Sequence, residues 1–98
     1  MFVERAAYFS VRMGVIPSRV RVGRANAYWG TCTGKNSVNF TWKLIFAPAD
    51  VIDYVVVHEL AHIREHNHSP RFWAIVESVL PDWKQRRKKL KPLQQNEQ

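Results

Sequence analysis

The four histidines of the chain all lie between residues 58 and 68. The first two enclose the pattern His-Glu-x-x-His, with Glu59 directly after the first histidine. In a helix, residues four apart differ by about 40° in direction and about 6 Å in height, so both imidazoles can reach one metal ion. Glu59 lies about 60° around the helix from His62, where it can act on a water molecule but is poorly placed as a third ligand.

The third ligand has two candidates, His66 and His68. In an unbroken helix His58, His62 and His66 would share one face, but they would span about 12 Å of rise, which is too much for one tetrahedral ion. The chain must therefore reverse first, and Asn67 tolerates the left-handed backbone conformation that ends helices. His68 lies in that reversal, at the third-histidine position of H-E-x-x-H-x-x-G-x-x-H. We predict that His58, His62 and His68 bind Zn²⁺.

Three histidines around zinc leave a fourth position for water, which is typical of catalytic sites. We therefore expect a zinc hydrolase in which Glu59 is the general base, taking a proton from water and passing it to the leaving group. A closed structural site would need a fourth protein ligand, and Cys32 is the candidate because thiolates bind zinc well. The competing interpretation of Cys32 is a small buried side chain.

The composition fits one small folded domain. The chain has 98 residues, of which 46% are hydrophobic and 12% aromatic. These values favour a single core over disorder. Because the chain has one cysteine, it can form no internal disulfide, so we expect a cytoplasmic protein, and its apolar stretches are too short to span a membrane.

The positive charge is local. The net charge is +7, and six of the fifteen Lys and Arg residues are Lys84, Arg86, Arg87, Lys88, Lys89 and Lys91. The rest of the chain is therefore close to neutral. Two interpretations of Lys84–Lys91 remain open: a solvated basic helix that packs through Trp83 and Leu90, or a surface that binds nucleotides or nucleic acid.

Hydrophobic periodicity predicts the elements that position these residues. Helices are expected over 4–13, from Pro48 through the histidine pattern, from Ser69 to residue 80, and from Asp82 to about 91. Strands are expected at 19–22 and 37–42, with 43–47 as an extension or a third strand, whereas 26–35 is rich in turn residues. We predict one α+β metallohydrolase domain over 1–91 and a polar C-terminal tail over 92–98.

Several residues mark the expected helix ends. Gly14 is a stop signal for the first helix, and Ser69 is an N-cap that precedes a proline at the first helical position. Asp82 and Gln85 have the spacing of a capping box.

Several blocks beyond the histidine pattern resemble the YgjP-like family of metal-dependent hydrolases. The blocks are WGTC at 29–32, VNF at 38–40, LIFAP at 44–48, VIDYVVVHELAH at 51–62, NHSPRFW at 67–73 and PDW at 81–83, followed by Arg86 and Arg87. The resemblance covers roughly residues 8–90. Most members of the family carry a longer, strand-rich region before the shared part.

The resemblance implies a zincin-like metallopeptidase fold, related to SprT-like and Wss-like proteases. Such a minimal catalytic core would have a small antiparallel or mixed sheet of two or three strands packed on an active-site helix, with further C-terminal helices. The resemblance also supports zinc binding by the three histidines and an acid/base role for Glu59. In related zincins a strand beside the active-site helix binds extended polypeptide by strand addition, which would be Ser37–Trp42 here.

The residues and the resemblance leave three candidate functions. The first is a zinc metallopeptidase that acts on unfolded or extended polypeptide. The second is a zinc-dependent nucleoside-triphosphate pyrophosphatase, an activity ascribed to some YgjP-like proteins, in which Arg71 and the basic helix would bind phosphates. The third is a non-enzymatic nucleic-acid-binding module with a structural metal.

Residues around the metal are harder to assign from sequence. Asn39, Tyr54 and Arg71 are candidates for substrate contact or for stabilising the oxyanion of the transition state. Asp53 and Glu65 are candidates for orienting a ligand histidine.

Overall fold

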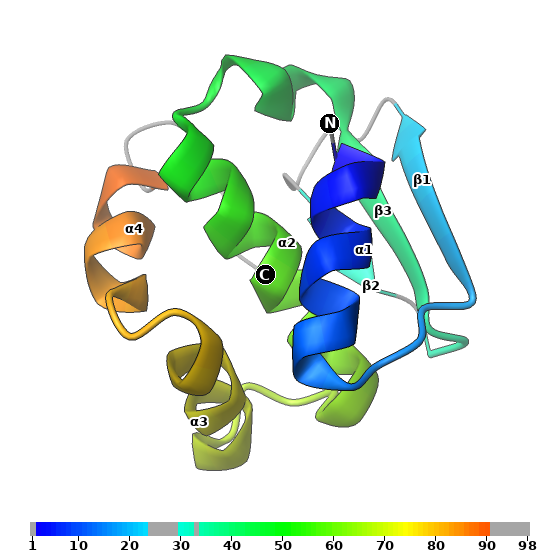
Figure 1. Cartoon of the computed structure of the whole chain (residues 1–98), viewed down its shortest axis with the longest axis vertical. Coiled ribbons are helices and arrows are strands. Elements are labelled where there is room, and N and C mark those ends of the chain that lie inside the picture. The colour runs from blue at the N-terminus through cyan, green and yellow to red at the C-terminus, as the bar shows by residue number, and fades with distance from the viewer. Residues whose placement is uncertain (1, 24–29, 33, 91–98) are drawn as a thin grey trace.

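The helix that carries the His-Glu-x-x-His pattern lies at the centre of the fold. The structure, a computed structural model, describes residues 2–23, 30–32 and 34–90. Its elements are α1 (Phe2–Met13), β1 (Arg19–Gly23), β2 (Gly30–Cys32), β3 (Ser37–Thr41), the 3-10 helix η1 (Trp42–Phe46), α2 (Ala49–Arg64), α3 (Pro70–Val79) and α4 (Trp83–Leu90). Figure 1 shows α1 and the sheet on one side of α2, with α3 and α4 on the other. The α+β class agrees with the prediction.

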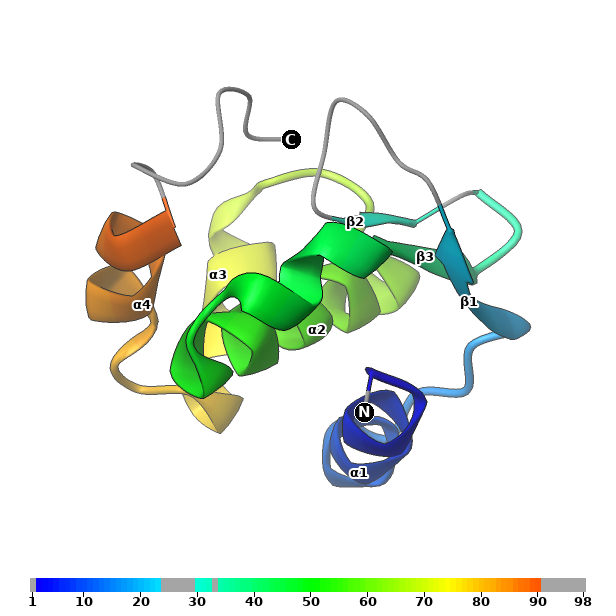
Figure 2. The same ribbon diagram turned by 90° about the horizontal axis from the view of Figure 1, so that it is seen from above.

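α2 is helical although it contains a run of β-branched residues, which favour strands. Every residue from Val51 to His62 is buried except Asp53, which is half-buried. The helix packs against α1, α3, α4 and β2, so it is covered on nearly all sides (Figure 2). Burial of this extent outweighs the low helix propensity of valine. The single apolar stripe expected from the sequence is therefore only part of the contact surface.

The sheet is mixed and has the order β1-β3-β2. β3 runs parallel to β1 and antiparallel to β2, in agreement with the expected small mixed sheet. Val38 and Phe40 are buried, whereas Asn39 between them is half-buried. Because successive side chains of a strand point to opposite faces, Asn39 lies on the face away from this buried pair.

Two parts of the strand prediction are wrong. β2 lies within the segment expected to form turns, because three residues are too few for alternation to be visible. Residues 43–47 form no strand, and Trp42 to Phe46 make up η1 instead. The last residue of β1, Gly23, pairs with Thr41, the last residue of β3. The described part of β1 therefore provides no pairing partner for the residues that follow Thr41.

The helix ends follow the sequence signals in part. Gly14 ends α1 with a φ of +67°, and the Ser69 hydroxyl accepts a hydrogen bond from the backbone N–H of Phe72 at 3.4 Å. The predicted capping box does not form, because the Asp82 carboxylate accepts from Nε of Arg86 at 2.9 Å.

The chain reversal after α2 does not use a left-handed residue at Asn67. α2 ends at Arg64, and Glu65 has an extended backbone with a φ of −143°. Asn36 has the only positive φ among the described residues other than glycine. The reversal therefore begins two residues earlier than the sequence suggested.

Ion pairs tie the outer helices to α2. Nε and Nη2 of Arg5 in α1 donate to the two carboxylate oxygens of Asp53, each at 2.8 Å. At the start of α2, the carboxylate of Asp50 accepts from Nζ of Lys89 at 2.6 Å, and its backbone carbonyl accepts from Nη1 of Arg86 at 3.0 Å. α4 is thereby fixed to the first turn of α2.

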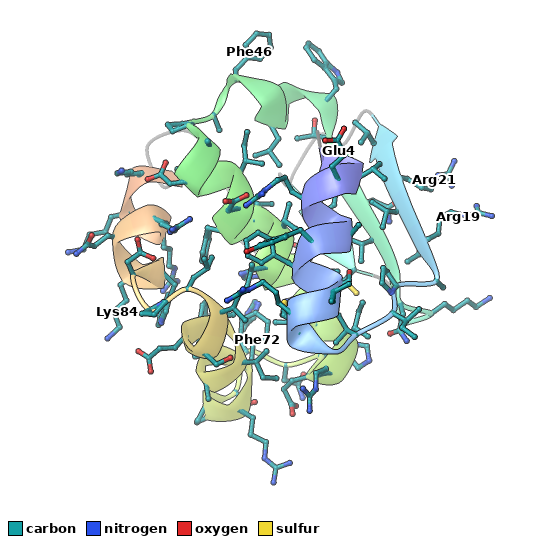
Figure 3. All side chains as sticks on the ribbon, viewed as in Figure 1. Glu4, Arg19, Arg21, Phe46, Phe72 and Lys84 are labelled. Atoms are coloured by element: carbon teal, nitrogen blue, oxygen red, sulfur yellow. The ribbon has the colours of Figure 1, made fainter. Side chains whose placement is uncertain are left out.

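Other side chains extend away from the fold. Figure 3 shows Arg19 and Arg21 pointing outward from β1, and Phe46 projecting from η1.

None of the helices in the described ranges combines the length and the apolar character that crossing a membrane requires.

Candidate metal centre

Three imidazole rings meet at the C-terminal end of α2. Nε2 of His68 lies 3.0 Å from Nε2 of His62 and 3.3 Å from Nε2 of His58. The candidate ligand atoms of the three residues all lie within 4.8 Å of one another. Nitrogens that each lie about 2.05 Å from one tetrahedral zinc ion are about 3.3 Å apart. The donor type and the spacing therefore both fit zinc.

The chain reversal brings His68 to the other two histidines. The backbone N–H of Glu65 bonds to the carbonyl of Ala61 at 3.0 Å and completes the last turn of α2. α3 begins five residues later at Pro70, so the link is short. His68 lies in this link and is exposed, whereas His58 and His62 are buried. His66 is also exposed and lies outside the group of three.

The Nδ1 atoms of the two helical histidines have partners of their own. The hydroxyl of Tyr54 lies 3.4 Å from Nδ1 of His58, and Nδ1 of His62 lies 3.2 Å from the backbone carbonyl of Glu65. These contacts leave both Nε2 atoms for the common centre and fix the ring orientation. Of the two carboxylates considered for this role, Glu65 acts through its backbone, and Asp53 is paired with Arg5.

Burial keeps the two helical histidines neutral. It lowers the pKa of His58 well below 6.5, and the neighbouring charges of His62, His68 and Arg87 lower this pKa further. Burial and the charge of His68 also lower the pKa of His62. Hydrogen bonds to the backbone of Glu65 and His66 raise this pKa, but the net shift is downward. A neutral imidazole is the form that binds a metal.

Glu59 is buried on α2, directly after His58. Its side chain is 1% exposed, and no hydrogen bond from the described residues reaches its Oε1 atom. Burial, followed by the negative charge of Glu59, raises the pKa of the Cys32 thiol on β2 to about 11. β2 packs against α2, the helix that carries Glu59. Cys32 is not part of the metal-binding group found among the described residues.

Aromatic residues of α3 enclose the histidines. The Phe72 ring is fully buried and lies 5.0, 4.5 and 4.9 Å from the rings of His58, His62 and His68. Figure 3 shows Phe72 reaching from α3 toward α2. The Trp73 ring lies 5.9 Å from that of His58 and 5.8 Å from that of His68. Phe72 and Trp73 belong to the NHSPRFW block noted in the sequence, but the pattern did not indicate their contact with the site.

The three predicted substrate contacts are placed differently. Tyr54 is 1% exposed, and its hydroxyl lies next to Nδ1 of His58. Asn39 is half-buried and lies on the face of β3 opposite Val38 and Phe40. Arg71 is exposed in the first turn of α3, and no described contact joins it to a histidine.

The predicted substrate strand is also wrong in its position. β3, which covers most of Ser37–Trp42, is the central strand and is paired on both edges. An extended chain cannot add to a strand that is already paired on both sides. β2 is paired on one edge only within the described residues, and it packs against α2.

The comparisons with known proteins agree with this architecture. The crystal structure of the metallopeptidase zymogen of Pyrococcus abyssi abylysin superposes with a TM-score of 0.84 over 98% of both chains, at 22% sequence identity. The fold is therefore that of a small metallopeptidase. The family model of the YgjP-like metallopeptidase domain matches residues 1–93, and the chain belongs to this family. No curated protein matched the sequence.

Proposed function

We propose that the protein is a zinc metallopeptidase that cleaves extended polypeptide, with His58, His62 and His68 as ligands. The observation that carries the proposal is the convergence of three Nε2 atoms at separations of 3.0 and 3.3 Å. When bound, a zinc ion would polarise water and the scissile carbonyl. Among the described residues the group comprises three ligands, which would leave a fourth coordination position for water on a bound ion.

Residues of the chain transfer the proton, orient a ligand and bind the substrate. The Glu59 carboxylate accepts a proton from the attacking water and later delivers it to the amine of the leaving group. Tyr54 is a positioning residue that orients His58. β2 is paired on one edge only among the described residues, and its other edge is the place where an extended substrate would add by backbone hydrogen bonds.

Neither alternative function has comparable support. Three of the basic residues expected to bind phosphates have partners within the molecule: Arg86 and Lys89 bind Asp50, and Lys84 lies over the Trp83 ring at 5.6 Å. These contacts favour the structural interpretation of the basic helix over nucleotide or nucleic-acid binding.

The first experiment tests the role of Glu59. Zinc-loaded wild type and Glu59→Gln are incubated with fluorescein-labelled casein, and Glu77→Gln serves as control because Glu77 is exposed on α3. Glu59→Gln should keep its zinc and lose at least about 100-fold in turnover, whereas the control keeps its activity. Equal cleavage by wild type and Glu59→Gln would refute the mechanism.

The second experiment tests the ligand set without relying on activity. Metal content is measured for the purified His68→Ala and His66→Ala variants. His68→Ala should lose most of its zinc, and His66→Ala should retain it. The opposite result would assign the third ligand to His66.

A further inference from the structure

An aromatic wall beside the histidines carries a guanidinium group. The Trp73 and Trp83 rings stack at 4.4 Å with an interplanar angle of 17°. Cζ of Arg87 lies 5.3 Å from the centre of the Trp73 ring. The same Trp73 ring lies within 6 Å of the rings of His58 and His68. Arg87 is therefore held on a side chain that also borders the proposed metal centre.

Arg87 differs from its basic neighbours in α4. Arg86 and Lys89 reach back to the start of α2, where they bind Asp50. Arg87 is half-buried and turns instead toward Trp73. The Trp73 ring on which it lies is 5.9 Å from the ring of His58. The two directions separate a pair that fixes α4 to α2 from a residue that lies against the aromatic wall beside the histidines.

A permanent positive charge is unfavourable beside residues that collect a divalent cation, because like charges repel. The same charge becomes favourable when negative charge develops in the site. In peptide hydrolysis this happens when water attacks: the new C–O bond forms, and the π electrons of the carbonyl move onto its oxygen. A preorganised cation at that point stabilises the transition state more than the substrate.

We infer that Arg87 is a catalytic residue that stabilises this oxyanion, and that Trp73 and Trp83 hold its guanidinium in place. The inference rests on the proposed peptidase function. Glu59 takes the proton released by the attacking water. When the oxyanion collapses, the C–N bond breaks and Glu59 returns the proton to the leaving nitrogen. Arg87 remains protonated throughout, since a guanidinium does not lose its proton in proteins.

The test compares Arg87→Gln with Lys88→Gln, which removes the same charge from an exposed neighbour on α4. Both zinc-loaded full-length variants are assayed with fluorescein-labelled casein, and zinc content and thermal melting are recorded. Arg87→Gln should lower kcat by about 100- to 1000-fold with little change in KM. Lys88→Gln should stay within about twofold of wild type.

A binding measurement supplies a readout besides turnover. The affinities of a phosphonamidate peptide, which carries a tetrahedral anion, and of a planar hydroxamate peptide are measured by calorimetry. Arg87→Gln should weaken phosphonamidate binding by about the same factor as kcat, and hydroxamate binding by much less. Equal losses for the two ligands, or no loss of kcat in a folded and zinc-loaded variant, would overturn the inference.

Two further experimental outcomes have a defined meaning: a variant that does not fold, and a wild type that does not cleave casein. If Arg87→Gln does not fold, Arg87→Lys replaces it: a fall of about tenfold in kcat supports the inference, and unchanged kcat with unchanged phosphonamidate affinity overturns it. If zinc-loaded wild type does not cleave casein any faster than Glu59→Gln, the proposed function itself fails, and the inference fails with it. A failure confined to the Arg87 comparisons leaves the proposed function intact.

Discussion

Tyr54 lies one turn before His58 on α2, and its hydroxyl is 3.4 Å from Nδ1 of His58. The two rings also pack edge to face, with centroids 5.7 Å apart. Tyr54 is therefore placed to orient a proposed ligand from inside the core, and its position four residues before His58 puts both side chains on one face of the helix.

Tyr54→Phe removes the hydroxyl and keeps the ring. We expect zinc affinity to fall by about 10- to 100-fold, because residues behind a ligand fix its orientation and basicity. Competition with a chromophoric chelator measures this affinity. Tyr8→Phe is the control, since Tyr8 is 48% exposed on α1. If both variants bind zinc like wild type, the Tyr54 hydroxyl does not orient His58.

The metal-free protein should lose stability on acidification below pH 6.5. Burial lowers the pKa values of His58 and His62 from 6.5 in the folded state. At pH values between the folded-state and the unfolded-state pKa of these histidines, the unfolded chain binds more protons than the folded protein. The contribution is complete above 6.5 and is lost as the pH falls from there, at up to about 1.4 kcal/mol per pH unit for each histidine.

Urea unfolding of the metal-free protein between pH 5 and 8 measures this dependence. His58→Gln should reduce the slope, because it removes one of the two buried imidazoles. A stability that does not vary over this range would contradict the proposed origin in buried neutral imidazoles.

The Arg5–Asp53 pair should contribute modestly to stability. Although the bond is bidentate, the Arg5 side chain is 38% exposed and that of Asp53 is 19% exposed, so solvent screens the pair. We expect a coupling energy of about 1 kcal/mol in a double-mutant cycle of Arg5→Met and Asp53→Asn, measured by urea unfolding. Zinc affinity should not change, and a change there would mean that Asp53 also acts on the metal centre.

The Cys32 thiol should react slowly in the folded, metal-free protein. Burial and the Glu59 charge raise its pKa from 9.0 to about 11. At pH 8 alkylation by iodoacetamide should be about 100-fold slower than in urea, because the thiolate fraction is lower. Glu59→Gln should speed the reaction, since it removes the negative charge. A rate that is the same in the Glu59→Gln variant would place the two residues farther apart.

The sequence predicted the parts of the fold that depend on local pattern. The helical spacing of the histidine pattern and the Ser69 N-cap were visible because they act within one or two turns. β2 was missed because three residues show no periodicity, and its existence depends on pairing with β3. Local signals cannot reveal an element that only a distant partner stabilises.

The same distinction holds at the candidate site. The grouping of His58, His62 and His68 could be expected from spacing and from the need for a chain reversal. The contacts made by Trp73 and Arg87 could not, because they join α3 and α4 across many residues. The guesses at Asn39 and Arg71 rested on residue type alone.

The three histidines differ in accessibility: two are in the core, and His68 is exposed on the link between α2 and α3. An incoming ion can therefore meet its last ligand from the solvent side without any rearrangement of α2. Loading and exchange of zinc should then follow local opening of residues 65–69, which is less costly than global unfolding. The protein would equilibrate with the free zinc of its surroundings while remaining folded, so zinc supply could set the fraction of active molecules.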